Sequence, residues 1–243
     1  MKFFNTVFDR PFVVPALLLS VALIIGLWIV GAGIANRSAD NVIVSTGSAT
    51  MSVKADDAKW TISVYRSALD GATAGAYSGV AADALQVTTY LKKANLASST
   101  ISATTIVADQ NYSSNNGPLQ YNVHQEITIE SSDVEGVQKL AQNIGQLTNQ
   151  GLSVSPQQPQ YFVSNLPELR VSLLGKAVAD AKARAIEIAQ SGGSSIGALR
   201  SASSGVVQVL APNSPSADDY GSYDTSTIQK EVSVTAHVTF AVR

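Results

Sequence analysis

Residues 193–197 carry the pattern Gly-x-Ser-x-Gly, which surrounds the nucleophile of many serine hydrolases. Ser195 would be the nucleophile, and Asp224 and His237 follow it in the chain order of an α/β-hydrolase triad. That chemistry needs the serine on a sharp turn from a strand into a helix. Here a predicted helix precedes the pattern and a predicted strand follows it. A helix stop and a turn therefore explain the glycines better, and a serine hydrolase acting through Ser195 is a remote alternative.

The two histidines are the other side chains that could bind a metal or move a proton near neutral pH. His124 alternates with Asn122 and Glu126, and His237 alternates with Thr235. Both are therefore expected on the polar, wet face of a strand. A metal site would need a third ligand, which no local spacing supplies. We expect two surface histidines and no metal site.

The composition excludes several other functions. The chain has no cysteine, so disulfides, thiolate catalysis and zinc–cysteine sites are excluded. There is no P-loop or dinucleotide fingerprint. We expect no cofactor, no catalytic residue and no enzymatic activity. The 16 basic and 18 acidic residues give a net charge of −2 without a basic block, so nucleic acid is not an expected partner.

The N-terminal segment, residues 12–34, contains no charged residue. As a helix it would be about 34 Å long, against a hydrocarbon core of about 30 Å. Lys2 and Arg10 precede it, which favours a cytoplasmic N-terminus. We expect a single-pass protein of the inner (plasma) membrane whose bulk is periplasmic. The expected parts are a cytoplasmic N-terminus (1–11), a transmembrane anchor (12–34), a linker (35–41) and an exported domain (42–243).

Two alternatives exist for this segment. A signal peptide could be cleaved at the small residues 33–35. The apolar run of a signal peptide is typically about 7–15 residues, which is shorter than this run and favours an uncleaved anchor. The second alternative is the buried helix of a soluble core.

Period-two alternation predicts strands in the exported part. The first two strands, near residues 42–53 and 60–65, are expected to form a hairpin through a turn at 55–57. A second hairpin is expected around a loop at 111–118. The remaining strands are predicted at 101–107, 121–129, 160–163, 196–210 and 231–242.

Apolar residues at three- and four-residue spacings predict three helices. The first covers residues 72–93 and the third covers residues 165–190. The second opens with the capping box Ser132-x-x-Glu135 and ends at Gly151. Strands outnumber helices, and one face of each well-patterned strand is polar. We therefore expect an α+β fold: a largely antiparallel sheet with helices packed on one face, preceded by one N-terminal transmembrane helix. The apolar stripe of the first helix is Tyr77, Val80, Ala84, Val87 and Leu91.

Gly71, Gly75 and Gly79 fall four residues apart at the start of the first helix. This spacing resembles the close-packing motif of membrane helices. A tight approach of the helix to the sheet is the favoured interpretation, and a subunit contact is the alternative.

Residues 211–227 are rich in Pro, Ser, Asp and Tyr and have no periodicity. This composition predicts a long exposed loop between the last two strands. One interpretation is a mobile hairpin tip. The other is a loop that binds a protein partner, because loops of this length are often functional. The candidate partner-binding residues are Asp218, Asp219, Tyr220 and Tyr223.

Residues 177–185, with the sequence AVADAKARA, are followed by Ala189, Gly192-Gly193 and Ile196-Gly197. This stretch resembles the SIMPL-domain family, also described as periplasmic or membrane-bound oxidative-stress defence proteins. The resemblance extends over nearly all of residues 42–243, although family members commonly have Pro where Ala55 stands. It implies an exported envelope protein with an α+β fold that assembles into ring-like or channel-like oligomers. It supplies no catalytic residues.

Three hypotheses follow. The first is a non-enzymatic envelope protein, anchored by residues 12–34, that self-assembles through its exported domain. The second is a monomeric periplasmic binding module that uses loop 211–227. The third is the serine hydrolase through Ser195.

Overall fold

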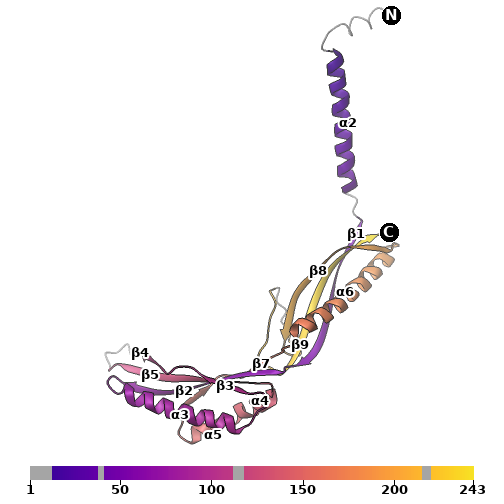
Figure 1. The fold of residues 1–243 in the computed structure, drawn as a ribbon. Coiled ribbons are helices and arrows are strands. Elements are labelled where there is room, and N and C mark those ends of the chain that lie inside the picture. Colours follow the sequence, from indigo (N-terminus) through magenta and orange to yellow (C-terminus); the bar gives the residue numbers. More distant parts are fainter. Residues whose placement is uncertain (1–12, 38–40, 112–117, 215–219) are drawn as a thin grey trace, which may run out of the picture. The chain divides into compact units, whose positions relative to one another are not determined.

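The computed structural model describes residues 13–37, 41–111, 118–214 and 220–243 (Figure 1). These residues form antiparallel sheets and helices, which confirms the expected α+β class. In chain order the elements are α2 (Val13–Arg37), β1 (Val42–Lys54), β2 (Asp57–Leu69), α3 (Thr73–Lys93), β3 (Thr100–Ala103), β4 (Val107–Asn111), β5 (Gln120–Ser131), α4 (Val134–Gln142), α5 (Gly145–Asn149), β6 (Val154–Pro156), β7 (Gln160–Phe162), α6 (Leu166–Ser191), β8 (Ile196–Leu210) and β9 (Gln229–Val242).

Helix α2 carries the apolar N-terminal segment. Its stretch from Pro15 to Ala32 is long and apolar enough to cross a membrane, and none of that stretch is buried. The exposed fraction of Trp28, for example, is 74%. This exposure speaks against the alternative of a buried core helix. Membrane anchoring and a signal sequence both fit the helix.

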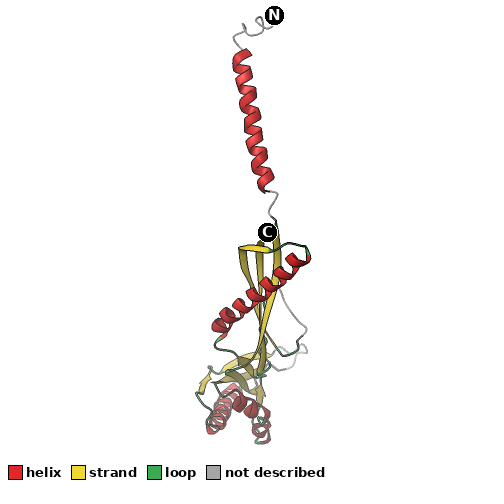
Figure 2. Ribbon diagram, turned by 90° about the vertical axis from the view of Figure 1, so that its right-hand side faces the viewer, coloured by secondary structure: helices red, strands yellow, loops and turns green. Residues whose placement is uncertain are grey.

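Strands β1, β9 and β8 form a three-stranded sheet in that order. The N–H of Val242 donates to the carbonyl of Asn41 and the N–H of Ala55 donates to that of Ile228, each at 2.8 Å. Residues further along β1 thus pair with residues earlier in β9, so the two strands are antiparallel. Helix α6 lies across this sheet (Figure 2). Leu173 of α6 shares a buried cluster with Val209, Val232 and Val234.

The sequence of β9 shows which face of this strand packs against α6. Alternate residues are apolar and buried on the α6 side, and the residues between them are more exposed. This is the period-two pattern of a strand with one covered face. The buried apolar residues are Val232, Val234, Ala236, Val238 and Phe240.

The expected hairpin between the first two strands is wrong. Strand β1 pairs with β9, whereas β2 belongs to the other sheet. The N–H of Ala55 donates to Ile228, and the N–H of Asp56 donates to the carbonyl of Phe162 at 3.0 Å. Because these two neighbouring amides find carbonyls on different strands, the chain runs on from one sheet into the other instead of turning back.

The second sheet has six strands among the described residues, with the order β3-β5-β2-β6. Strand β4 also pairs with β5, and β7 also pairs with β2. The central pair β2 and β5 is antiparallel from Ala58↔Ser131 to Leu69↔Gln120. The pairs Ala103↔Ile127 and Val107↔His124 leave one extra residue between β3 and β4, which is a β-bulge in the predicted second hairpin.

Helices α3 and α4 pack on one face of this six-stranded sheet. Trp60 of β2 is fully buried there, and its indole N–H donates to the carbonyl of Gln157 at 2.9 Å. The predicted apolar stripe of α3 is correct except at its first residue. Tyr77 is 38% exposed, and Ala76 is buried in its place. The confirmed stripe residues are Val80, Ala84, Val87 and Leu91.

The predicted second helix differs from the observed one at its start and in its middle. Asp133, not Ser132, is the N-cap, because its carboxylate accepts the N–H of Gly136 at 2.9 Å. The helix then divides into α4 and α5. Asn143 ends α4 by donating its side-chain amide to the carbonyl of Lys139 at 2.8 Å. Gly151 follows α5 with a φ of 87°, as expected for a helix stop.

Candidate functional site

Ser195 lies between α6 and β8, which is the helix-to-strand order expected from the sequence and the reverse of a nucleophile elbow. Its hydroxyl lies 3.5 Å from the carbonyl of Arg243, to which it donates. His237 shares a 2.9 Å hydrogen bond with the hydroxyl of Thr46. Asp224 binds its own set of neighbours, described below. Each member of the hypothetical triad therefore has a partner outside the triad.

The two histidines have different surroundings. His237 is exposed, as expected. The side chain of His124 is only 26% exposed, and its Nδ1 lies 3.6 Å from the carboxylate of Asp109. That Nδ1 is buried without a hydrogen-bond partner. The prediction that His124 lies on a solvent-exposed strand face is therefore only partly correct. Among the described residues, no three His, Asp or Glu side chains are grouped as a metal site would require.

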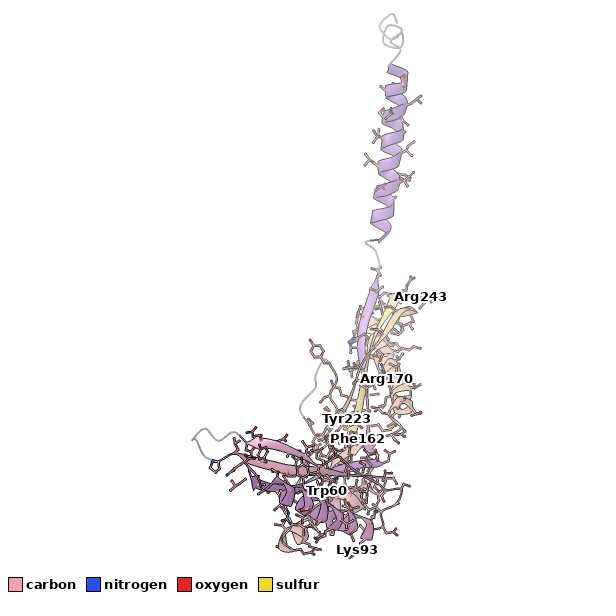
Figure 3. The ribbon with its side chains drawn as sticks, turned by 60° about the vertical axis from the view of Figure 1, so that its left-hand side comes forward. Trp60, Lys93, Phe162, Arg170, Tyr223 and Arg243 are labelled. Atoms are coloured by element: carbon pink, nitrogen blue, oxygen red, sulfur yellow. The ribbon has the colours of Figure 1, made fainter. Side chains whose placement is uncertain are left out.

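The two tyrosines of loop 211–227 also differ. Tyr220 is 97% exposed. The hydroxyl of Tyr223 accepts the N–H of Val163 at 2.9 Å, and its ring lies 6.1 Å from that of Phe162, centroid to centroid (Figure 3). Tyr223 thus holds the loop to β7. The other two candidate residues, Asp218 and Asp219, lie outside the described residues, and the partner-binding role of all four stays a prediction.

Sequence reasoning missed a buried ionic cluster at the end of this loop. Lys230 is 0% exposed, and its ammonium donates to the backbone carbonyl of Asp224 and, at 3.0 Å, to the carboxylate of Asp224. The same carboxylate accepts the backbone N–H and hydroxyl groups of Ser226 and Thr227. A signal was present in the sequence, because Lys230 has the same strand parity as Val232 and therefore belongs to the buried face of β9.

The pKa values of this pair follow from burial and hydrogen bonding. Partial burial acts to raise the pKa of Asp224, but hydrogen bonds from Lys230, Ser226 and Thr227 outweigh burial and lower the pKa from 3.8 to about 2. Burial lowers the pKa of Lys230, and the hydrogen bond to Asp224 partly offsets this effect. The carboxylate is thus ionised at neutral pH and serves as a structural anchor for the loop.

A shallow depression of about 580 Å³ lies beside this cluster. Its lining includes Lys54, Glu135 and Lys139 together with Ser226 and Thr227. Lys54 and Glu135 form a 2.6 Å ion pair, and the hydrogen bond from Lys54 lowers the pKa of Glu135. The charged lining is therefore largely engaged in surface pairing.

The last part of the loop covers one end of strand β8. The N–H of Val209 donates to the carbonyl of Ser222 at 2.8 Å, and the N–H of Asp224 donates back to Val209 at 2.7 Å. These bonds lie on the side of β8 that faces away from β9. Towards its start, β8 has no strand on that side among the described residues.

The alternation of β8 is interrupted between Ser195 and Val209, because these two residues have the same parity and Ser195 bonds to β9. Gly197 lies against Ala241 and Gly205 against Thr235, so β8 has two extra residues between these contacts.

Both edges of the three-stranded sheet are long strands with few charges. Strand β8 has 15 residues with Arg200 as its one charge, and β1 has 13 residues with Lys54 as its one charge. Along β1, the N–H of Ser48 is taken by the carboxylate of Asp180 at 2.9 Å, so the stretch before it is the open part of that edge. The edges of the six-stranded sheet are instead pieces of three to five residues.

The fold and the apolar helix together define a class of protein: an α+β domain that follows an N-terminal helix able to span a membrane, as in a membrane-anchored envelope protein. The family model "SIMPL: Protein of unknown function (DUF541)" matches residues 43–241. The chain therefore belongs to the SIMPL family, as the sequence resemblance indicated. A comparison with curated proteins finds no match.

Proposed function

We propose that this chain is a non-enzymatic envelope protein, held in the inner membrane by α2, that self-assembles through its exported SIMPL domain. The N-terminus is cytoplasmic and the domain lies on the other side of the membrane. The assembly acts as a scaffold or a channel-like oligomer. Its link to envelope or oxidative stress rests on the description of the family alone.

The open edges of the three-stranded sheet support this proposal most directly. An unpaired strand presents a row of N–H and carbonyl groups that can pair with another chain. Proteins that remain monomeric usually protect such edges with short strands, prolines or several charges. The six-stranded sheet has the short edges expected of a protected sheet, whereas β8 and β1 are long and nearly uncharged.

A proline on the open part of β8 tests the proposal. Ser195 exchanges two hydrogen bonds with Arg243, so the N–H of Ala198 points away from β9 by the alternation of an antiparallel ladder. Ala198→Pro removes that outward donor without removing a bond to β9. We expect the full-length variant in mild detergent to have a smaller mass by light scattering than the wild type.

The matched control is Ala198→Thr, which keeps the N–H and favours a strand. It should assemble as the wild type does, and both variants should retain the wild-type far-ultraviolet circular dichroism. A wild type that is monomeric at micromolar concentration would contradict the proposed function.

The exposed ring of Tyr220 favours a second candidate function, a monomeric module that binds a protein partner through loop 211–227. Tyr220→Ser should then abolish capture of the partner while the fold is kept. Tyr223→Phe is the matched control variant, because the hydroxyl of Tyr223 is hydrogen-bonded to Val163 of the same chain. Capture that survives Tyr220→Ser would contradict this second function.

A further inference from the structure

The two open edges of the three-stranded sheet have complementary positions. Asn41 and Ser195 pair with adjacent residues of β9, Val242 and Arg243. Position 196 of β8 is therefore level with Asn41 on β1. Gly197 lies against Ala241, so the same register holds there and Gly197 is level with Val42. Two residues further along each strand, Leu199 is level with Val44.

Val44 and Leu199 also lie on the same face of the sheet. The hydrogen bond between Thr46 and His237 shows that Thr46, and with it Val44, is on the face of His237. A Cβ built at Gly197 would lie 3.4 Å from the Cβ of Ala241, so Leu199 shares that face too. Val44 is 66% exposed and Leu199 is 50% exposed, because each stands at an edge without a neighbour.

The anchor restricts how two copies can meet. At most four residues, 38–41, connect the end of α2 to the start of β1, a reach of about 14 Å. Each β1 therefore starts near the membrane that holds α2. Strands β1 and β8 are both antiparallel to β9, so they run in the same direction. Copies in one membrane can join β8 to β1 in parallel, whereas an antiparallel β8-to-β8 pair would turn one anchor away from the membrane.

We propose that the open edge of β8 pairs in parallel with the open edge of β1 from a second copy of this chain, with Leu199 opposite the partner's Val44. This inference rests on the proposed self-assembly and adds its surface and its partner. Such a contact uses two different edges, so each copy keeps one edge for the next copy, and the rotation between copies decides whether a ring closes. Pairing also brings two exposed apolar side chains together across strands, which stabilises a sheet.

Cysteine cross-linking of the full-length protein tests the pairing, since the natural chain has no cysteine. Within one copy β9 separates the two positions by about 10 Å, two strand spacings. A disulfide tolerates a Cα separation of at most about 7 Å, so a disulfide in Val44→Cys/Leu199→Cys must join two copies. We expect mild oxidation to give a ladder of covalent dimers, trimers and larger species.

Three controls sharpen the result. Neither single variant should cross-link. Val44→Cys/Arg200→Cys should cross-link far less, because Arg200 has the opposite strand parity and lies on the other face. Val42→Cys/Gly197→Cys, two residues earlier along each strand, should give a ladder again, because both positions are level with Ala241 of β9.

The outcomes separate this inference from the proposed function. A covalent dimer from Leu199→Cys alone would mean β8-to-β8 pairing and would overturn the inference. A multimeric mass in detergent without cross-links in either matched pair would place the contacts elsewhere and leave the proposed function standing. A monomeric mass for the wild-type protein would overturn both.

Discussion

Lys230 is fully buried, which is rare for a lysine side chain. It is the second residue of β9, and Asp224 at the loop end supplies both of its hydrogen-bond acceptors. A buried ammonium ion is strongly destabilising unless it is paired. Asp224 therefore fixes the end of loop 211–227 to the start of β9.

Asp224→Asn should destabilise the domain more than Lys230→Met. Loss of the carboxylate leaves a buried charge without its counter-ion, and we expect a decrease of about 3 kcal/mol in the free energy of unfolding. Lys230→Met replaces the buried charge by an apolar chain of similar length and should cost at most about 1 kcal/mol. Urea denaturation of the domain without α2 measures both, and equal losses would contradict the argument.

The pKa of Asp224 also predicts a pH dependence. Because its folded value of about 2 lies below the unfolded value of 3.8, its contribution is complete above about pH 4 and is lost as the pH falls toward 2. The difference corresponds to about 2 kcal/mol. Unfolding free energies measured at pH 5, 4, 3 and 2 should show this loss in the wild type. The loss should be correspondingly smaller in Asp224→Asn, and identical pH profiles would exclude the assigned role.

Of the three spaced glycines, Gly71 lies just before α3, and Gly79 is the one that meets a residue of the sheet. A Cβ there would lie 2.6 Å from the Cδ of Arg66, whereas Gly75 has nothing within 4 Å. Arg66 donates to the buried carboxylate of Asp83 at 2.8 and 3.0 Å. The expected tight approach is thus confirmed at one position.

Gly79→Ala should therefore be less stable than Gly75→Ala. In an open helix position the exchange to Ala stabilises by up to about 1 kcal/mol, which is expected for Gly75→Ala. In Gly79→Ala the displaced Arg66 loses its two hydrogen bonds to the buried carboxylate of Asp83, and this loss offsets the gain in helix propensity. Thermal unfolding of both variants measures the difference, and equal stabilisation by the two would mean that Arg66 is free to move aside.

At the scale of elements, α4 has its N-cap at Asp133, whereas the sequence suggested Ser132. Asp133→Ala removes the acceptor of the Gly136 N–H and should cost about 1 kcal/mol. Ser132→Ala removes the residue that the capping box named and should cost less, because its hydroxyl has only a 3.5 Å contact with Ala97. Chemical denaturation measures the free energy of unfolding of both variants. A larger decrease for Ser132→Ala would mean that Ser132 is the N-cap, as the capping box predicted.

The elements themselves were predictable because periodicity is a local property. The helices, the strands β5, β8 and β9, and the polar second face of the strands all follow from alternation or three- and four-residue spacing. Short strands such as β6 were not predictable, because three residues carry too little pattern. The hairpin at 55–57 failed since the partners of Ala55 and Asp56 lie more than 100 residues away in the sequence.

The candidate site was predictable only in part for the same reason. Composition located loop 211–227, but it could not separate Tyr223, which is hydrogen-bonded to Val163, from the exposed Tyr220. The burial of Lys230 could have been read from strand parity. The open edges of β8 and β1 could not be predicted from the sequence, because the order of strands in a sheet depends on pairing between distant segments.

At the scale of the whole molecule, the SIMPL domain and the apolar helix α2 are consecutive parts of one chain. The helix supplies attachment to a membrane, or an export signal, and the domain carries the two open sheet edges. We therefore propose that the domain carries assembly and the helix carries attachment.

The most direct test is the mass, by multi-angle light scattering, of the full-length protein in mild detergent beside that of residues 41–243 alone. We expect a discrete multimer in both, since the pairing edges belong to the domain. A multimer with α2 but a monomer without it would move the contacts to the helix, and monomers in both would contradict self-assembly altogether.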